Sequence, residues 1–155
     1  MSVRSFFDTN VLVYLDDPSA PKKQRRALDL YAEHRRAGTG VISIQVLQEY
    51  FATVTRKYAV DAASARRKVE LFAEFDVVVP DVSDVLRAID LHRLRGLSFW
   101  DAMVVSAAKQ AGCAVLLTED LQDGRELEGL RVVNPFRAEV PAAHERAAAY
   151  RTKAR

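Results

Sequence analysis

Short apolar runs alternate along the chain with longer segments in which hydrophobic residues recur at helical spacing. The apolar runs are three to five residues long and cover 3–7, 41–43, 77–79, 114–117 and 131–133. Apolar positions three and four residues apart predict helices between them, and these are expected over 22–37, 46–58, 62–75, 83–95 and 99–111. Short continuous strands that alternate with helices are typical of a parallel sheet covered on both faces. The pattern predicts a single α/β domain, with three α/β/α layers around a short, mostly parallel sheet.

Two segments near the ends of the chain depart from this alternation. After Phe7 the first apolar run meets Asp8-Thr9-Asn10, where we expect the strand to end in a turn. Residues 138–155 are rich in alanine and basic, with Pro141 near their start, and are expected to form a frayed helix or a loose tail. The sequence therefore predicts a domain over 1–137 and a basic, alanine-rich tail over 138–155.

Composition narrows the class of protein. The 155 residues are 49% hydrophobic and 28% charged, which is ordinary globular composition. No apolar run approaches the ~20 residues that span a membrane, and Asp8 interrupts the apolar N-terminus, so neither a membrane segment nor a signal peptide is expected. Cys113 is the only cysteine, which excludes intrachain disulfides and cysteine-based zinc sites. We expect a cytoplasmic protein.

Basic residues are clustered, although the net charge is only +2. Clustered cations favour polyanions such as RNA, but for any single cluster the solvated face of a helix is the favoured explanation. The clusters are Lys22, Lys23, Arg25 and Arg26; Arg35 and Arg36; Arg66, Arg67 and Lys68; and Arg146, Arg151, Lys153 and Arg155 in the tail.

Two aspartates follow predicted strands. Asp8 comes after the first strand and Asp120 after the strand at 114–117. Ligands of open parallel sheets collect at the carboxyl ends of the strands, so both carboxylates belong at the same edge. An aspartate after a strand is also a common turn former or helix cap, which leaves a structural explanation for each.

Two further acids have competing explanations. Asp101 lies in an apolar segment that we expect to be buried, yet Ser98 three residues earlier makes a capping-box pattern that would explain it structurally. Glu49 falls on the polar side of its helix with Gln45, so periodicity alone indicates a solvated glutamate. If such acids converge, they repel one another unless a cation is present. Oxygen ligands favour magnesium, manganese or calcium over zinc.

Four motifs in order resemble the PIN-domain nucleases, and most of all the VapC-type toxins of bacterial toxin–antitoxin pairs. The resemblance covers about residues 3–136. It implies a Rossmann-like α/β/α fold, endoribonuclease activity dependent on Mg²⁺ or Mn²⁺, a homodimer and inhibition by a co-encoded antitoxin. The motifs are Phe7-Asp8-Thr9-Asn10-Val11, Ser43-Ile44-Gln45-Val46-Leu47-Gln48-Glu49-Tyr50, Phe99-Trp100-Asp101-Ala102 and Leu117-Thr118-Glu119-Asp120.

The resemblance also implies roles for individual residues. Asp8 and Asp101 match the direct metal ligands, while Glu49 and Asp120 would complete the catalytic acidic set, partly through water. Polar residues that orient these ligands match Asn10 and Thr118. Three acids are candidates for the fourth position: Glu119, Asp120 and Asp123. We favour Asp120 and keep Asp123 as the second candidate. Trp100 beside Asp101 is expected to pack in the core or on a dimer surface rather than stack on a base.

The predicted chemistry is hydrolysis of RNA phosphodiesters, with single-stranded loops as substrates. Three alternatives stay open. One is a phosphotransferase or phosphatase with Asp8 as nucleophile, although such enzymes usually carry a second acid where this chain has Asn10. The others are a non-catalytic RNA-binding module and a free-standing RNA-processing nuclease without an antitoxin.

Overall fold

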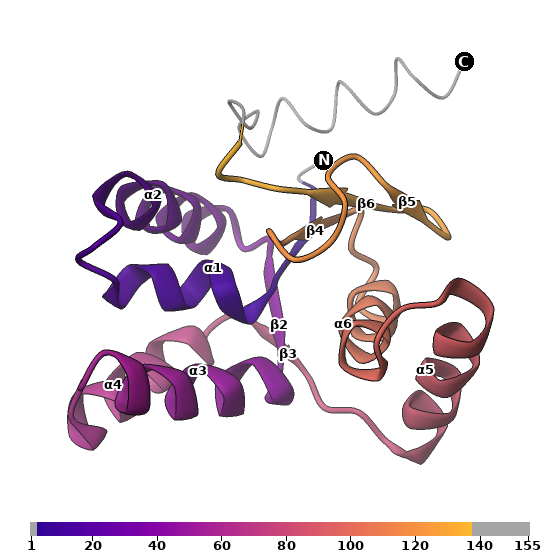
Figure 1. Ribbon diagram of the computed structural model, residues 1–155, viewed down its shortest axis with the longest axis horizontal. Helices are drawn as coiled ribbons and strands as arrows, with labels where there is room; N and C mark the ends of the chain where they lie inside the picture. Colours follow the sequence, from indigo (N-terminus) through magenta and orange to yellow (C-terminus); the bar gives the residue numbers. More distant parts are fainter. Residues whose placement is uncertain (1–2, 138–155) are drawn as a thin grey trace.

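The computed structural model describes residues 3–137, which form one sheet between two helical layers (Figure 1). The strands are β1 (Ser5–Phe7), β2 (Gly40–Ser43), β3 (Asp76–Val78), β4 (Val115–Leu117), β5 (Glu126–Leu127) and β6 (Leu130–Val133). The helices are α1 (Thr9–Val13), the 3-10 helix η1 (Tyr14–Asp16), α2 (Pro21–Ala37), α3 (Ile44–Lys57), α4 (Ala62–Phe72), α5 (Val82–Arg95) and α6 (Phe99–Gln110). The predicted domain boundary and the tail at 138–155 lie outside the described residues.

The sheet has the strand order β3-β2-β1-β4-β6-β5, and every neighbouring pair except β5–β6 is parallel. The chain moves outward from β1 to β3 and then crosses to the other side of β1. Consequently α1 to α4 cover one face and α5 and α6 cover the other (Figure 1). Strand direction and connection handedness together require this arrangement. The predicted three-layer α/β/α class, with a short and mostly parallel sheet, is confirmed.

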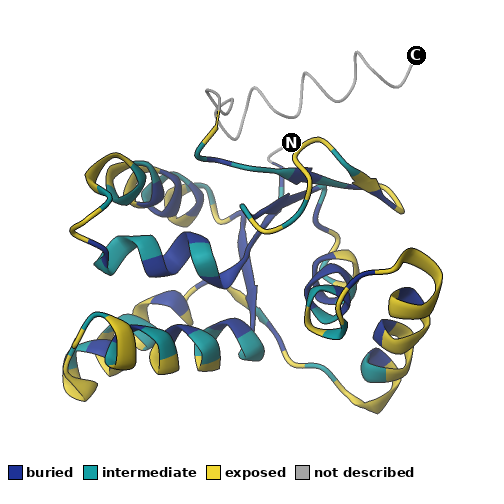
Figure 2. Cartoon of the chain, in the orientation of Figure 1, coloured by how far each residue is buried: buried dark blue, intermediate teal, exposed yellow. Residues whose placement is uncertain are grey.

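Burial follows this layering. Every residue of β1, β2 and β4 is buried, whereas the outer faces of α4 and α5 are exposed (Figure 2). The central strands carry side chains into both helical layers, which explains why they are continuous apolar runs instead of alternating patterns. Phe6 and Phe7 are fully buried and lie opposite Leu116 and Leu117 of β4.

Two local elements differ from the sequence prediction. The chain forms α1 directly after Asp8, where a turn was expected, because the Asp8 carboxylate accepts the Thr9 amide and caps the helix. At the far edge, β5 and β6 form an unpredicted hairpin. Its turn residues Glu128 and Gly129 both have positive φ, at 53° and 88°. That conformation is typical of a two-residue hairpin turn.

The carboxyl edge of the sheet gathers the predicted acids. Asp8 and Thr118 each follow directly after a central parallel strand, β1 and β4. Helix α3 begins immediately after β2, at Ser43, whose hydroxyl accepts the Val46 amide and caps the helix. Helix α6 runs back along the sheet before β4, so its first turn, with Asp101, also belongs at this edge. Within residues 3–137, no helix is long and apolar enough to cross a membrane.

Candidate active site

Asp8 is the most buried acid of the predicted set, with only 7% of its surface exposed. The Thr9 amide donates to its Oδ1 at 2.8 Å, and the Thr118 hydroxyl donates to its Oδ2 at 2.8 Å. The Asn10 amide nitrogen adds a longer contact of 3.3 Å to Oδ2. A carboxylate has about four acceptor positions, so three donors fix this side chain and leave it one further interaction.

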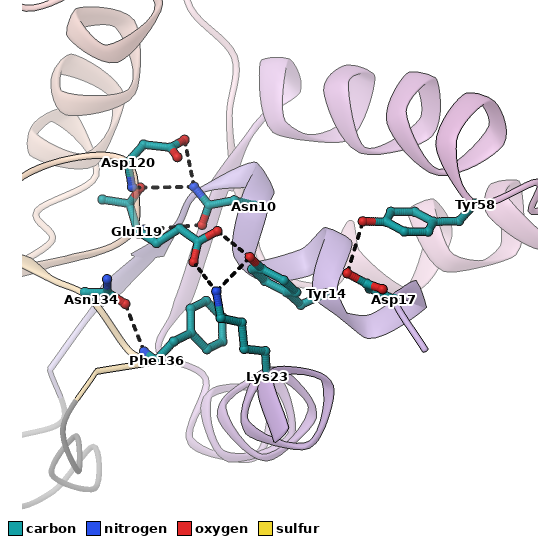
Figure 3. A network of polar contacts seen from close by, with 10 residues as sticks. Asn10, Tyr14, Asp17, Lys23, Tyr58, Glu119, Asp120, Asn134 and Phe136 are labelled. Atoms are coloured by element: carbon teal, nitrogen blue, oxygen red, sulfur yellow. Dashed lines mark hydrogen bonds and ion pairs between the residues drawn. The ribbon is translucent and has the colours of Figure 1, made fainter. Parts of the chain in front are cut away.

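Asn10 and Thr118 connect Asp8 to Asp120, and Figure 3 shows the bond between Asn10 and Asp120. The Asn10 amide nitrogen lies 3.1 Å from the Thr118 hydroxyl and 2.9 Å from Oδ2 of Asp120. The Asp120 backbone amide donates to the same Thr118 hydroxyl at 3.1 Å. Asn10 and Thr118 therefore each contact the carboxylate of Asp8 and fix its orientation.

Glu49 reaches the same network from α3. The Thr9 hydroxyl donates to its Oε2 at 2.7 Å, and the Gln45 side-chain amide donates to its Oε1 at 2.8 Å. Helical periodicity indicated a solvated glutamate here, but Glu49 is half-buried and held at both oxygens. Sequence reasoning did not assign a role to Thr9 or Gln45. The signals available were adjacency to Asp8 and a four-residue spacing from Glu49.

Asp101 is positioned by a different interaction. Its backbone amide donates to the Ser98 hydroxyl at 3.1 Å, so Ser98 caps α6 as the sequence suggested. The reciprocal bond of a full capping box is not among the contacts of residues 3–137. The Asp101 carboxylate has no hydrogen bond or ion pair with any residue in that range, and it is half-buried where full burial was expected. It is thus free to accept a ligand at this edge.

The two competing acids have structural partners. Glu119 pairs with Lys23 at 2.9 Å and accepts the Tyr14 hydroxyl at 2.5 Å (Figure 3). Asp123 accepts the Asn134 amide at 2.8 Å and fixes the loop before β5 to the end of β6. Of the three carboxylates, only that of Asp120 accepts the Asn10 amide that also contacts Asp8, whereas Glu119 meets Asn10 through its backbone amide. No local sequence signal marked Tyr14 and Lys23, because their partner lies about a hundred positions away.

The electrostatics of Asp8 favour a cation. Burial raises the pKa of the Asp8 carboxyl from 3.8 to about 6. The hydrogen bonds from Thr118 and Thr9 oppose this effect, while the negative charges of Asp120 and Glu49 add to it. An ionised Asp8 is therefore costly in the protein alone, and a bound cation would remove that cost.

The donor set suits a hard divalent cation. Asp8, Glu49, Asp101 and Asp120 offer only oxygen, which magnesium and manganese prefer. In residues 3–137, no three acidic, histidine or cysteine side chains already converge on one point. The Asn10 amide instead stands between Asp8 and Asp120 and neutralises part of their repulsion. The oxygen donors fit such an ion in chemistry.

Trp100 has 62% of its surface exposed, so the interpretation that it packs in the core is wrong. Its ring makes an edge contact with Phe99, with centroids 5.1 Å apart. The side chain is left free for a dimer surface or for a base.

A PIN domain family model matches residues 5–122, and the chain belongs to this family. No match was found among curated proteins. Solved structures share the fold. A toxin–antitoxin complex from Klebsiella pneumoniae has a TM-score of 0.64 at 20% identity, covering 85% of this chain and 98% of that one.

Two further solved structures have similar TM-scores and sequence identities to this chain. Mycobacterium tuberculosis VapC20, a toxin that cleaves the sarcin–ricin loop, has a TM-score of 0.61 at 21% identity and covers 75% of this chain and 91% of its own. DNA-bound VapBC from Salmonella typhimurium has a TM-score of 0.59 at 18% identity, with coverage of 86% and 98%. At these identities, the likeness concerns the fold.

Proposed function

We propose that this protein is a Mg²⁺- or Mn²⁺-dependent endoribonuclease and the toxin of a type II toxin–antitoxin pair. The observation that carries the proposal is the buried Asp8 carboxylate, linked to Asp120 through Asn10 and Thr118 and to Glu49 through Thr9. In a chain of the PIN domain family, these linked carboxylates support a cation-dependent reaction on a phosphodiester. The fold shared with VapC20 and VapBC supports the choice of RNA and of an antitoxin. The proposal includes a cytoplasmic location, where RNA is available.

Each acid has a distinct role in this proposal. Asp8 and Asp101 would hold the cation directly, since one is rigidly fixed and the other has an unengaged carboxylate. When bound, such an ion polarises a phosphate oxygen and lowers the pKa of water. Asp120 is the exposed acid of the set and uses only Oδ2 in its bond with Asn10, so its other oxygen can accept the proton of an attacking water. Glu49 has donors at both oxygens and serves to position the set.

The hydrogen bonds of Asp8 and two further experimental observations distinguish the proposed function from the three alternatives. Three donors immobilise the Asp8 carboxylate, which disfavours its use as a nucleophile toward phosphate. A non-catalytic RNA-binding module would leave RNA intact when Mg²⁺ or Mn²⁺ is added. A free-standing processing nuclease would lack a neighbouring short gene for a DNA-binding antitoxin.

The homodimer forms part of the proposal. Helix α5 exposes Val82, Leu86 and Ile89, which are spaced four and three residues apart on one stripe. A second copy of the chain could cover this stripe, as apolar surface favours burial. Sedimentation of wild-type protein and of Leu86→Glu would test it: the wild type should sediment as a dimer and the variant as a monomer.

The central experiment measures cleavage of single-stranded RNA by purified protein with Mg²⁺, Mn²⁺ or chelator. Asp8→Asn and Asp101→Asn should each slow cleavage by roughly 10²–10⁴, because the charge that holds the cation is removed. Asp90→Asn, on the exposed surface of α5, is the matched control. Near wild-type cleavage by Asp101→Asn, or cleavage undiminished by chelator, would contradict the proposal.

A further inference from the structure

A pocket of about 330 Å³ adjoins the acidic site. Asn10 and Asp120 belong to both, so the pocket opens directly from the proposed reaction centre. Its far wall is the C-terminal half of α3, with Thr53, Lys57 and Tyr58. Figure 3 shows Tyr14 between the Asn10–Asp120 pair on one side and Tyr58 with Asp17 on the other. A volume of this order suits a small organic group.

The charged side chains that line the pocket differ in the partners they have. Glu119 pairs with Lys23 and Tyr14, while Asp17 accepts hydrogen bonds from Ser19 and Tyr58. Lys57 has no ion pair with any residue in 3–137, and its ammonium lies 5.6 Å from the centre of the Tyr58 ring. Lys57 is the only cation among the residues that line the pocket, and it interacts electrostatically with Asp17 without forming an ion pair. A phosphate in the pocket would therefore have Lys57 as its cationic contact.

Lys57 and Thr53 extend the line of Glu49 along α3. The three residues are spaced four apart, so they share one face of the helix. Glu49 contacts the acidic network at one end, and Lys57 lies roughly 12 Å further along the axis at 1.5 Å per residue. The Thr53 hydroxyl lies between them and makes no hydrogen bond within residues 3–137. A polar donor and a cation thus lead away from the reaction centre with the pocket beside them.

We infer that this pocket binds the RNA nucleotide next to the scissile phosphate, with Lys57 pairing with the following phosphate and Thr53 contacting the sugar between them. The inference rests on the proposed function. A phosphate at the acidic site and a second one at Lys57 would flank one nucleotide, whose base enters a space lined by Tyr14 and Tyr58. Lys57 is then a substrate-binding residue, and the open volume beside Thr53 limits which nucleotide fits.

Binding in chelator tests the cation without cleavage. The probe is a single-stranded RNA dodecamer of random sequence, and the variants are Lys57→Gln and its neighbour Arg56→Gln, a cation of the same helix that does not line the pocket. One phosphate contributes a salt slope of about 0.7 on single strands. Lys57→Gln should therefore lower the slope by about 0.7 and weaken binding about fivefold at ~0.1 M salt. Arg56→Gln should change neither beyond a small uniform decrease in affinity.

Filling the pocket tests its volume independently. Thr53→Phe should raise KM for RNA cleavage at least about tenfold, the effect of excluding one stacked base worth roughly 1.4 kcal/mol. Thr55→Phe, on the same helix and outside the pocket, should not. Thermal melting of each variant checks that it is folded.

The outcomes separate the pocket from the catalytic proposal. Suppose that RNA is cleaved in a metal-dependent way, but Lys57→Gln binds RNA with the affinity and salt slope of Arg56→Gln, and Thr53→Phe has the KM of Thr55→Phe. The pocket inference is then overturned, while the nuclease proposal stands. Should the protein cleave no RNA yet bind it through Lys57, the pocket stands and the catalytic proposal fails. Absence of RNA binding in chelator by the wild type also overturns the inference.

Discussion

The Thr118 hydroxyl donates a 2.8 Å hydrogen bond to Oδ2 of Asp8, although the two residues are 110 positions apart. The register of the central strands explains this contact: Phe7 lies opposite Leu117 in the parallel pair β1–β4, so the residues that follow each strand are neighbours. Asp8 is thereby fixed by an element that forms only when the sheet is complete. The Asp8 backbone amide also donates to the Leu117 carbonyl at 3.0 Å, so both the backbone and the side chain of the proposed metal ligand are held by β4 and the residue after it.

The first prediction concerns the pH dependence of folding in the absence of divalent cations. The pKa of Asp8 is about 6 in the folded protein, against an ordinary value of 3.8. Between these values the folded state binds the extra proton, so the free energy of unfolding falls as pH rises. The difference corresponds to about 3 kcal/mol above pH 6. Denaturant unfolding of wild type and Asp8→Asn in chelator should show a difference in stability that favours the variant at pH 7 and vanishes near pH 4.

Two effects decide the size of that difference. The Asp8→Asn change removes the buried charge but turns an NH₂ group toward the Thr118 and Asn10 donors, which offsets part of the gain. Asp123→Asn provides the exposed control and should leave the pH profile unchanged. A parallel pH profile for wild type and Asp8→Asn would contradict the assigned pKa.

The second prediction is that divalent cations stabilise the wild-type fold. Binding to the native state alone adds about 2.7 kcal/mol at 100 times the dissociation constant. Thermal melting with Mg²⁺, Mn²⁺ or chelator measures the gain. The double variant Asp8→Asn/Asp101→Asn should show no such gain, since both proposed ligands are neutral. An identical shift in wild type and double variant would place the ion elsewhere.

The third prediction separates the three acids after β4. Asp120→Asn should slow RNA cleavage by roughly 10²-fold or more, as expected when a proton acceptor is removed. Glu119→Gln should weaken its pairing with Lys23 and Tyr14, and Asp123→Asn its bond to Asn134, with cleavage largely retained. Cleavage rates at saturating RNA, measured on folded protein, provide the comparison. A larger decrease in Asp123→Asn than in Asp120→Asn would assign the role to Asp123.

The fold and the location of the acids could be predicted from sequence because both follow from short-range patterns. The apolar runs predicted the strands, and the positions directly after two of these strands predicted that Asp8 and Asp120 lie at the same edge of the sheet. Helix α1 could not be predicted, since a helix of five residues, three of them β-branched, carries no periodic signal and depends on the Asp8 cap. The hairpin β5–β6 has only two residues on its outer strand, and its turn Glu128-Gly129 is weaker than an Asn-Gly signal.

The side-chain network depended on long-range geometry. Nothing near Glu119 in sequence indicated its pairing with Tyr14 and Lys23. The same limit applies to the basic clusters. Lys68 is paired with the buried carboxylate of Asp16, and Arg66 with Glu70 at 2.6 Å, so two cations of the predicted RNA patch already have partners.

The fourth prediction follows from the Asp16 contact. Asp16 has a side chain only 6% exposed and accepts the Tyr50 hydroxyl as well as Lys68. Lys68→Gln should therefore lower the free energy of unfolding by about 1–3 kcal/mol, because a buried carboxylate is left without its cation. Arg67→Gln, on the exposed face of the same helix, should stay within about 0.5 kcal/mol of wild type. Urea unfolding decides between them, and equal stability of the two variants would contradict a structural role for Lys68.

The last prediction concerns the basic tail, residues 138–155. The described chain reaches the tail beside the site: Phe136 packs against Tyr14 with centroids 4.8 Å apart, and Arg26 donates to the Pro135 carbonyl at 3.2 Å. Tyr14 in turn contacts Glu119, which precedes Asp120. An acidic site repels phosphates, so cations supplied from this position would help RNA approach. Ending the chain after Phe136 keeps these anchoring residues while it removes the tail cations.

The truncated protein should bind single-stranded RNA more weakly, with a salt slope reduced by about 0.7 for each phosphate that the tail no longer neutralises. Cleavage at saturating RNA should be retained, because Asp8, Asp101 and Asp120 are untouched. A full-length variant in which the five cations beyond Phe136 are changed to Gln is the matched control for charge, and should behave like the truncation: Arg137, Arg146, Arg151, Lys153 and Arg155. If both proteins bind RNA with the wild-type affinity and salt slope, the tail does not touch RNA. Weaker binding in the truncation alone would instead assign the effect to the tail backbone or its apolar residues.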